Sequence, residues 1–134
     1  MTALSSYAER AVLDHIFKNT SYTSPTAYMG LFTTDPTDSA SGTEVSGNGY
    51  NRIEISSKMA SATTGSDNSS IVSNADITFP TASGGDFGVI THIGIFDALT
   101  SGNLLAHGAL TSAKTISDGD TFRINSGSLT ITID

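Results

Sequence analysis

The sequence predicts a mainly β protein: an antiparallel, jelly-roll-like β-sandwich with one amphipathic α-helix at its N-terminus. Three observations predict this class. After Pro25, short runs of β-forming residues alternate with turn signals about every 8–12 residues. A helical spacing of apolar residues is clear only before that point. Charged residues make up 14% of the chain, and Ser, Thr, Gly and Asn are abundant, as in β proteins with many turns.

The N-terminal helix is expected to span about Thr2 to Phe17. Ser6 and Glu9 have the spacing of a capping box, in which each side chain bonds the backbone N–H of the other residue. Lys18 and Asn19 suit the C-terminal end, because a cation stabilises the helix dipole and Asn tolerates a left-handed backbone. We expect the helix to pack its apolar stripe onto the sandwich rather than to project as an arm. The stripe, widened by Leu13, comprises Leu4, Ala8, Val12, Ile16 and Phe17.

The first half of the β region contains two expected strands and two polar loops. Thr26 to Phe32 is rich in β-forming residues and is closed by the turn-prone Asp35-Pro36 pair. The segment Thr37 to Asn48 has the composition of a loop. Tyr50 to Met59 alternates polar and apolar residues and is predicted as a half-buried strand, followed by a second polar loop at Ala60 to Ser70.

The second half contains the strongest strand signal, Gly88 to Ala98. Its apolar residues fall on both faces, with Ile93 and Ile95 on one face and Ile90 on the other, which predicts a strand covered on both sides. The turn at 100–103 leads into Leu104 to Leu110, so we expect a central antiparallel hairpin. The other predicted strands are Ile71-Val72, Ala75–Phe79, Ala113–Ser117, Thr121–Ile124 and Ser128–Ile133, whose Leu129, Ile131 and Ile133 are expected to face the core.

Length and composition limit the classes of function that the chain can have. The 134 residues fit one domain over residues 1–134, and the absence of cysteine excludes disulfides and thiolate metal sites. The chain has no apolar run of the roughly 20 residues that cross a bilayer and no signal peptide layout, so no membrane association is expected. The formal charge of −7 repels phosphate backbones, so no nucleic-acid partner is expected either.

Few residues are of the types that bind metal ions. The three histidines, His15, His92 and His107, are metal ligands by type, but their spacing gives no support, although His92 and His107 are expected to face each other across the central hairpin. The Asp118-Gly119-Asp120 segment offers carboxylates for calcium, but it lacks the EF-hand spacing and is better explained as a turn. We therefore predict no metal-binding residues.

No catalytic or cofactor-binding residues are predicted. The sequence has neither a Gly-x-Ser-x-Gly elbow nor a cysteine nucleophile, and Gly47-x-Gly49 lacks the third glycine and the helix that dinucleotide binding requires. Four tyrosines have the chemistry to line a sugar-binding groove, but core packing or subunit contact explains them at least as well. These are Tyr7, Tyr22, Tyr28 and Tyr50. The chain is thus expected not to be an enzyme.

Seven segments are distributed in order along almost the whole chain: 11–17, 28–36, 42–50, 74–80, 91–97, 102–105 and 108–110, which read AVLDHIF, YMGLFTTDP, GTEVSGNGY, NADITFP, THIGIFD, GNLL and GAL. With these segments the chain resembles a family of phage virion structural proteins often labelled tail fibre proteins. No single motif is diagnostic, but their order and spacing together are fairly specific. Phe87 stands where a typical relative carries Trp, a departure that changes little but volume.

The resemblance implies a non-enzymatic component of a tailed-phage particle, made in the host cytoplasm and assembled into the virion. Our first expectation is a capsid decoration or cement protein that binds the major capsid protein or other virion proteins and forms a homo-oligomer. A fibre that must reach across a distance usually needs repeats or a coiled coil, which this chain lacks. The alternatives are a tail or tail-fibre component that recognises a host receptor or carbohydrate, and a cell-surface hydrolase, which the missing catalytic residues disfavour. The loops Thr37–Asn48 and Ala60–Ser70 are expected to form the contacts with the particle, because they are long, polar and not needed for the core.

Overall fold

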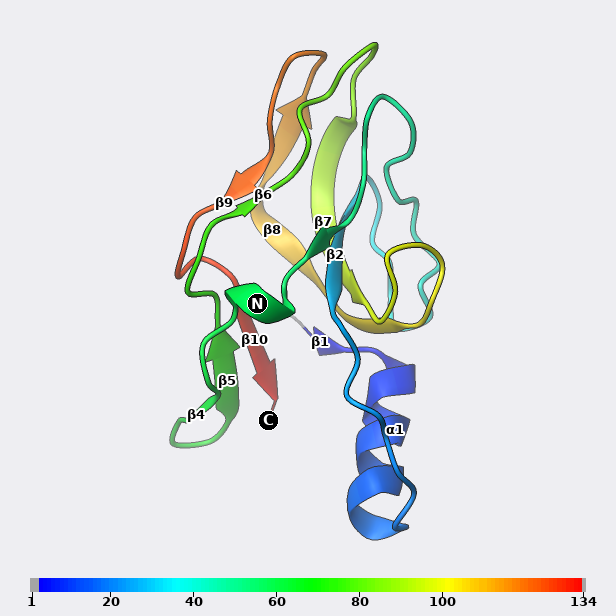
Figure 1. Ribbon diagram of the computed structural model, residues 1–134, viewed down its shortest axis with the longest axis vertical. Helices are drawn as coiled ribbons and strands as arrows, with labels where there is room; N and C mark the ends of the chain where they lie inside the picture. Colours follow the sequence, from blue (N-terminus) through cyan, green and yellow to red (C-terminus); the bar gives the residue numbers. More distant parts are fainter. Residues whose placement is uncertain (1–2, 134) are drawn as a thin grey trace.

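The computed structural model describes residues 3–133, which form one α-helix, one short 3₁₀ helix and ten strands in antiparallel sheets (Figure 1). The sheets face one another in a sandwich-like arrangement, so the predicted mainly β class with an N-terminal helix is confirmed. In chain order the elements are β1 (Ala3–Leu4), α1 (Ser6–Phe17), β2 (Tyr28–Phe32), β3 (Ile53–Glu54), η1 (Ser56–Lys58), β4 (Thr63–Thr64), β5 (Ser69–Val72), β6 (Ile77–Thr78), β7 (Gly88–Phe96), β8 (Leu104–Ile116), β9 (Arg123–Ile124) and β10 (Thr130–Ile133).

The main sheet has five strands in the order β1-β8-β7-β2-β3. Strand β7 lies at its centre and pairs with β8 over nearly its whole length, from Gly88 opposite Ile116 to Phe96 opposite Leu104. The predicted central hairpin is therefore confirmed. The sequence predicted two strands in the place of β8, with a break near Thr111, but the polar residues there are exposed within one continuous strand.

An irregular register in the β7–β8 pair changes which side chains share a face. Ile90 pairs with Lys114, whereas His92 pairs with Ala109, so β8 contributes extra residues at this point. Such a bulge interrupts the two-residue alternation of side chains on β8. On β7 itself, Ile90 and Ile93 belong to the same buried cluster, so the expectation that they lie on opposite faces is wrong.

That cluster connects the main sheet with the two smaller sheets, β10-β5-β4 and β6-β9. Met29, Leu31 and Ile90 from the main sheet and Ile77 from β6 have no exposed surface. Leu129 is buried and Ile131 packs against the cluster, but Ile133 is 51% exposed, so the expected inward row of β10 does not extend to its end. A second, small cluster on the other face of the main sheet contains Phe32, Phe96 and Leu104.

The strand predicted at Tyr50 to Met59 is much shorter in the structure. Only Ile53–Glu54 pairs with β2, and the chain then turns into η1. The carboxylate of Glu54 causes this turn locally, since it accepts hydrogen bonds from the backbone N–H of Ser57 at 2.9 Å and from its hydroxyl at 2.6 Å. The predicted loop at Ala60 to Ser70 contains β4, which pairs with the start of β5.

The helix begins later than predicted. Ala3–Leu4 forms an edge strand against β8, and Ser5 is the N-cap, with its hydroxyl oxygen 3.2 Å from the N–H of Ala8. Ser5 is fully buried and also donates its hydroxyl proton to the carbonyl oxygen of Leu104. The capping box expected at Ser6 and Glu9 is therefore wrong: the edge strand fixes Ser5 as the cap, and Ala8, three residues later, has no side chain that could bond back to it. Thr2, the expected first helical residue, lies outside the described residues.

The rest of α1 extends away from the sheets (Figure 1). Within the helix only Ala8 is buried, while Val12, Leu13, Ile16 and Phe17 are 39%, 55%, 62% and 81% exposed. The expectation that the apolar stripe packs onto the sandwich therefore holds for Leu4 and Ala8 but is wrong for Val12, Ile16 and Phe17. The helix is attached through its first turn, and the later part of the stripe extends beyond that attachment. Within residues 3–133 no helix has the length and apolarity that crossing a membrane requires.

The position of β7 at the centre of the core generates a stability prediction. Ile95→Ala should lower the free energy of unfolding by about 2–5 kcal/mol, because the side chain is 2% exposed and its loss leaves a cavity. Ile133→Ala removes the same atoms from a side chain that is 51% exposed and should cost less than about 1 kcal/mol. Urea denaturation followed by circular dichroism measures both values, and equal losses would contradict this assignment of the core.

Candidate functional site

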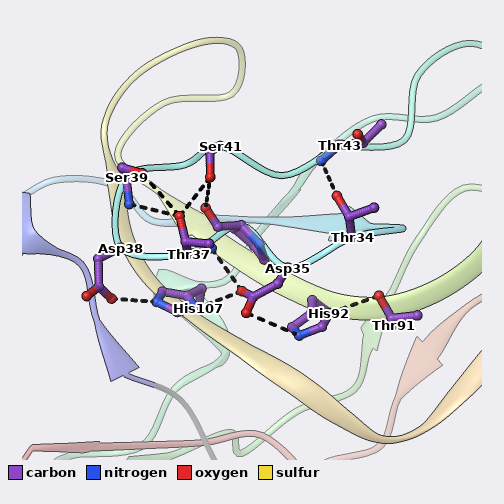
Figure 2. Close-up of polar contacts among 11 residues, drawn as sticks. Thr34, Asp35, Thr37, Asp38, Ser39, Ser41, Thr43, Thr91, His92 and His107 are labelled. Atoms are coloured by element: carbon purple, nitrogen blue, oxygen red, sulfur yellow. Dashed lines mark hydrogen bonds and ion pairs between the residues drawn. The ribbon is translucent and has the colours of Figure 1, made fainter.

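A cluster of titratable side chains lies where the loop after β2 crosses β7 and β8 (Figure 2). The carboxylate of Asp35 lies between two of the predicted histidines, with Oδ1 3.7 Å from His107 Nδ1 and Oδ2 3.9 Å from His92 Nε2. His107 Nε2 lies 2.8 Å from Oδ1 of Asp38. His92 and His107 are offset along the β7–β8 pair rather than directly opposite, and they share Asp35 instead of contacting each other.

The loop that carries Asp35 and Asp38 is held by its own polar groups as well (Figure 2). Thr37 has a left-handed backbone, with φ of 55°, and its N–H donates to Asp35 Oδ1 at 2.9 Å. Its hydroxyl lies 2.8 Å from that of Ser41, and the N–H of Thr43 donates to the Thr34 hydroxyl at 2.8 Å. These contacts hold the loop in its own conformation, and the contacts of Asp35 and Asp38 with the two histidines connect it to the main sheet.

The other predicted chemical groups lie apart from this cluster. His15 is on α1, where its Nδ1 accepts a hydrogen bond of 3.3 Å from the N–H of Tyr22. Asp118 accepts from the N–H of Gly84 and Asp120 from that of Ser117, so both carboxylates bind backbone. Gly119 between them has a φ of 89°, which confirms the predicted turn. Among residues 3–133 no group of three or more His, Asp or Glu side chains is arranged to hold a metal ion.

The four tyrosines do not form one groove. Tyr7 and Tyr22 border a shallow depression beside α1, and Tyr28 lies on β2. Tyr50 packs in the interior, stacked on Phe79 at 6.3 Å between ring centroids and edge-on to Phe87 at 5.7 Å. Core packing therefore explains Tyr50, which agrees with the prediction that packing accounts for the tyrosines at least as well as sugar binding.

The strongest polar network in the fold was not predicted from the sequence. The guanidinium of Arg52 makes a two-pronged ion pair with Glu44, with Nε 2.8 Å from Oε1 and Nη2 2.7 Å from Oε2. Its Nη1 donates to the carbonyl oxygens of Ala98 at 2.8 Å and Ser101 at 2.7 Å. The charge also lies over the ring of Phe96, 3.6 Å from the centroid. Arg52 is only 9% exposed, and such burial is tolerated because nearly every donor has a partner.

Tyr50 extends this network into the main sheet. Its hydroxyl donates to Glu44 Oε1 at 2.8 Å and accepts from the N–H of Leu31 at 2.9 Å. Burial is the main cause that raises the pKa of Tyr50, and the adjacent Glu44 carboxylate raises it further. Gly30 makes room for the pair, because a Cβ at this position would lie 2.6 Å from Glu44 Oε1.

An open cleft of about 480 Å³ lies between the second half of β8 and the segment 121–130. Side chains that the core holds in place form its apolar lining, among them Ile93, Leu110, Phe122 and Leu129. Lys114 and Arg123 also line it, and the described lining residues include no carboxylate. Arg123 is 3.7 Å from Asp76, which lies outside the cleft. Nothing in the spacing of the sequence indicates this cleft, since its two sides come from separate sheets.

Comparison with known protein families gives one match that covers nearly the whole chain. Residues 3–132 match the family described as Podophage GP4 fiber I protein gp80. The chain belongs to this family. The match confirms the resemblance to phage tail fibre proteins that the order of the sequence segments indicated. No curated protein matches the sequence.

Membership of this fibre family makes the chain a structural component of a phage particle. The geometry agrees with such a role, because the polar clusters described above hold loops in position. Loop position matters in a structural protein, since rigid loops on a β scaffold commonly form its contact surfaces.

The ion pair at Arg52 generates a second prediction. Arg52→Met should lower the free energy of unfolding by about 3 kcal/mol or more, because it leaves the largely buried Glu44 charge without a cation, with only the Tyr50 hydroxyl still bound to it. The double variant Glu44→Gln/Arg52→Met should be more stable than Arg52→Met alone, since the unpaired charge is gone. Lys18→Met is the control, because it removes a positive charge from an exposed position. Equal stability of the single and double variants would contradict this interpretation.

The raised pKa of Tyr50 generates a third prediction. The folded protein disfavours the ionised phenol, whereas the unfolded chain ionises it near its ordinary pKa of about 10. The contribution of Tyr50 to stability is therefore complete below pH 10 and is lost progressively as the pH rises above that value. Denaturation at pH 8 and pH 11 should show a smaller loss of stability for Tyr50→Phe than for the natural sequence. Tyr7→Phe, on α1, serves as the control and should keep the full alkaline loss.

Proposed function

We propose that the chain is a building block of the tail fibre apparatus of its phage and acts through protein–protein contacts without catalysing a reaction. The observation that carries this proposal is the family match over residues 3–132, since that family is described as a fibre protein. This proposal replaces the capsid decoration role as the preferred function.

The structure supports a role based on contacts. Asp35 and His107 are of residue types that often act as acids and bases in enzymes, but here they connect the loop after β2 to the main sheet. By contrast, α1 presents four apolar side chains to solvent, from Val12 to Phe17. Exposed apolar side chains gathered on one element are typical of interaction sites.

The predicted contact loops differ in how much the fold needs them. The segment Thr37–Asn48 was expected to be unneeded for the core, and this is wrong, because Val45 is buried in the core cluster and Glu44 binds Arg52. The tip of the β4–β5 hairpin, residues 61–68, is exposed throughout. We propose that α1 and this tip, rather than the whole of Thr37–Asn48, are available for contacts with other virion proteins.

A capsid decoration or cement protein is the second candidate. One observation favours it: the described residues form a single set of packed sheets, with no repeated unit that would build a long shaft. A chain of this kind needs a separate shaft protein to reach away from the particle. The partner in this case would be the major capsid protein.

Locating the chain on intact particles tests the two candidates. Gold-labelled antibodies against the chain should mark the tail in electron micrographs, and quantitative mass spectrometry should give about a dozen copies or fewer per particle, the expectation for a tail symmetry. The major capsid protein provides the internal standard for copy number. Label over the head, with a copy number close to that of the capsid protein, would reject the fibre proposal in favour of decoration.

A further inference from the structure

The exposed side of α1 has the pattern of a helix that docks into a groove. Residues 9, 12, 13, 16 and 17 follow the spacing i, i+3, i+4, i+7 and i+8, which places them on one face. Four of them are the exposed apolar residues, and the fifth, Glu9, adds a negative charge at the N-terminal end of the face. We call this set of five residues the arm face. Anchors at these intervals are typical of helix-in-groove recognition.

The length of α1 decides what kind of surface can bind it. Twelve residues make a helix only about 18 Å long, whereas a stable interface usually buries about 800 Å² on each partner. Two such helices lying side by side cover much less than this area. The arm face therefore needs a concave partner that encloses it.

The same chain has a concave surface of suitable chemistry in the cleft beside β8. Its volume of about 480 Å³ falls within the range of about 300–1,000 Å³ of ligand-binding pockets. The apolar part of its lining, which includes Leu110, Phe122 and Leu129, suits the aliphatic and aromatic side chains of the arm face, and Ser, Thr and Asn side chains make up much of the rest. Its two cations, Lys114 and Arg123, complement the charge of Glu9, and among the described lining residues no carboxylate opposes it.

We propose that α1 of one copy docks in this cleft on a second copy of the chain. A helix cannot fill the cleft of its own chain, because α1 extends from one end of the molecule while the second half of β8 and β9 lie toward the other (Figure 1). The contact joins two different surfaces, so it is head-to-tail and produces either a closed ring or an open chain of copies. The role of this contact in the particle rests on the proposed function, but the contact itself is a property of the purified chain.

Two variants with defects on opposite sides of the contact test this proposal. The arm variant is Ile16→Asp/Phe17→Asp, and the cleft variant is Thr111→Arg/Lys114→Glu; all four residues are exposed, so both variants should fold. The unmodified chain should form concentration-dependent oligomers in sedimentation velocity, and each variant alone should be monomeric, with a dissociation constant raised at least about tenfold. An equimolar mixture should form dimers and nothing larger, since only one intact arm and one intact cleft remain. Leu99→Asp, an exposed apolar residue outside both surfaces, is the matched control and should assemble normally.

Several results would overturn the proposal. The unmodified chain staying monomeric at high concentration would do so, as would a cleft variant that assembles like the unmodified chain. An arm variant that assembles normally in solution but is not incorporated into particles would mean that α1 binds another virion protein. Thermal melting of every variant separates loss of assembly from loss of folding. Because the sedimentation experiment uses only the purified chain, label found on the head would reject the fibre proposal without affecting the proposed contact between copies.

Discussion

The ion pair between Arg52 and Glu44 is the constraint on which the loop structure of this protein depends. One buried guanidinium binds the loop after β2 through Glu44 and the β7–β8 turn through the carbonyl oxygens of Ala98 and Ser101. It also covers the ring of Phe96. Segments far apart in the sequence thus share one charged group, whose desolvation cost is offset only while all of its partners remain in place. The network leaves little freedom to the loops around it.

The irregular pairing of β7 and β8 has a comparable influence on the core. It interrupts the alternation of side chains on β8, opposite the part of β7 where Ile90, Ile93 and Ile95 all belong to one buried cluster. The smaller sheets then have a continuous apolar surface to pack against. The opposite face of the main sheet retains the small cluster around Phe32 and Phe96, over which Arg52 and the loop after β2 lie.

Features encoded by neighbouring residues could be predicted from the sequence, whereas features that depend on distant pairing could not. The helix, the central hairpin and the turn at Gly119 all follow from local spacing or backbone preference. The exposure of Phe17 could not be predicted, because periodicity identifies an apolar face without showing whether anything covers it. Arg52 and Glu44 looked like ordinary polar residues of a strand and a loop, since their partnership is visible only once the chain is folded. The cleft beside β8 is of the same kind, because it lies between separate sheets.

The junction between β1 and α1 also has a mechanical consequence. A pull on the helix reaches the body of the protein through Ser5, whose N–H donates to the carbonyl of Leu105 at 2.9 Å and whose hydroxyl donates to that of Leu104. Both carbonyls belong to β8, the 13-residue strand that pairs with the central strand β7. Tension is thereby spread along the longest ladder of the fold, so the attachment of the helix resists force better than the two paired residues of β1 would alone.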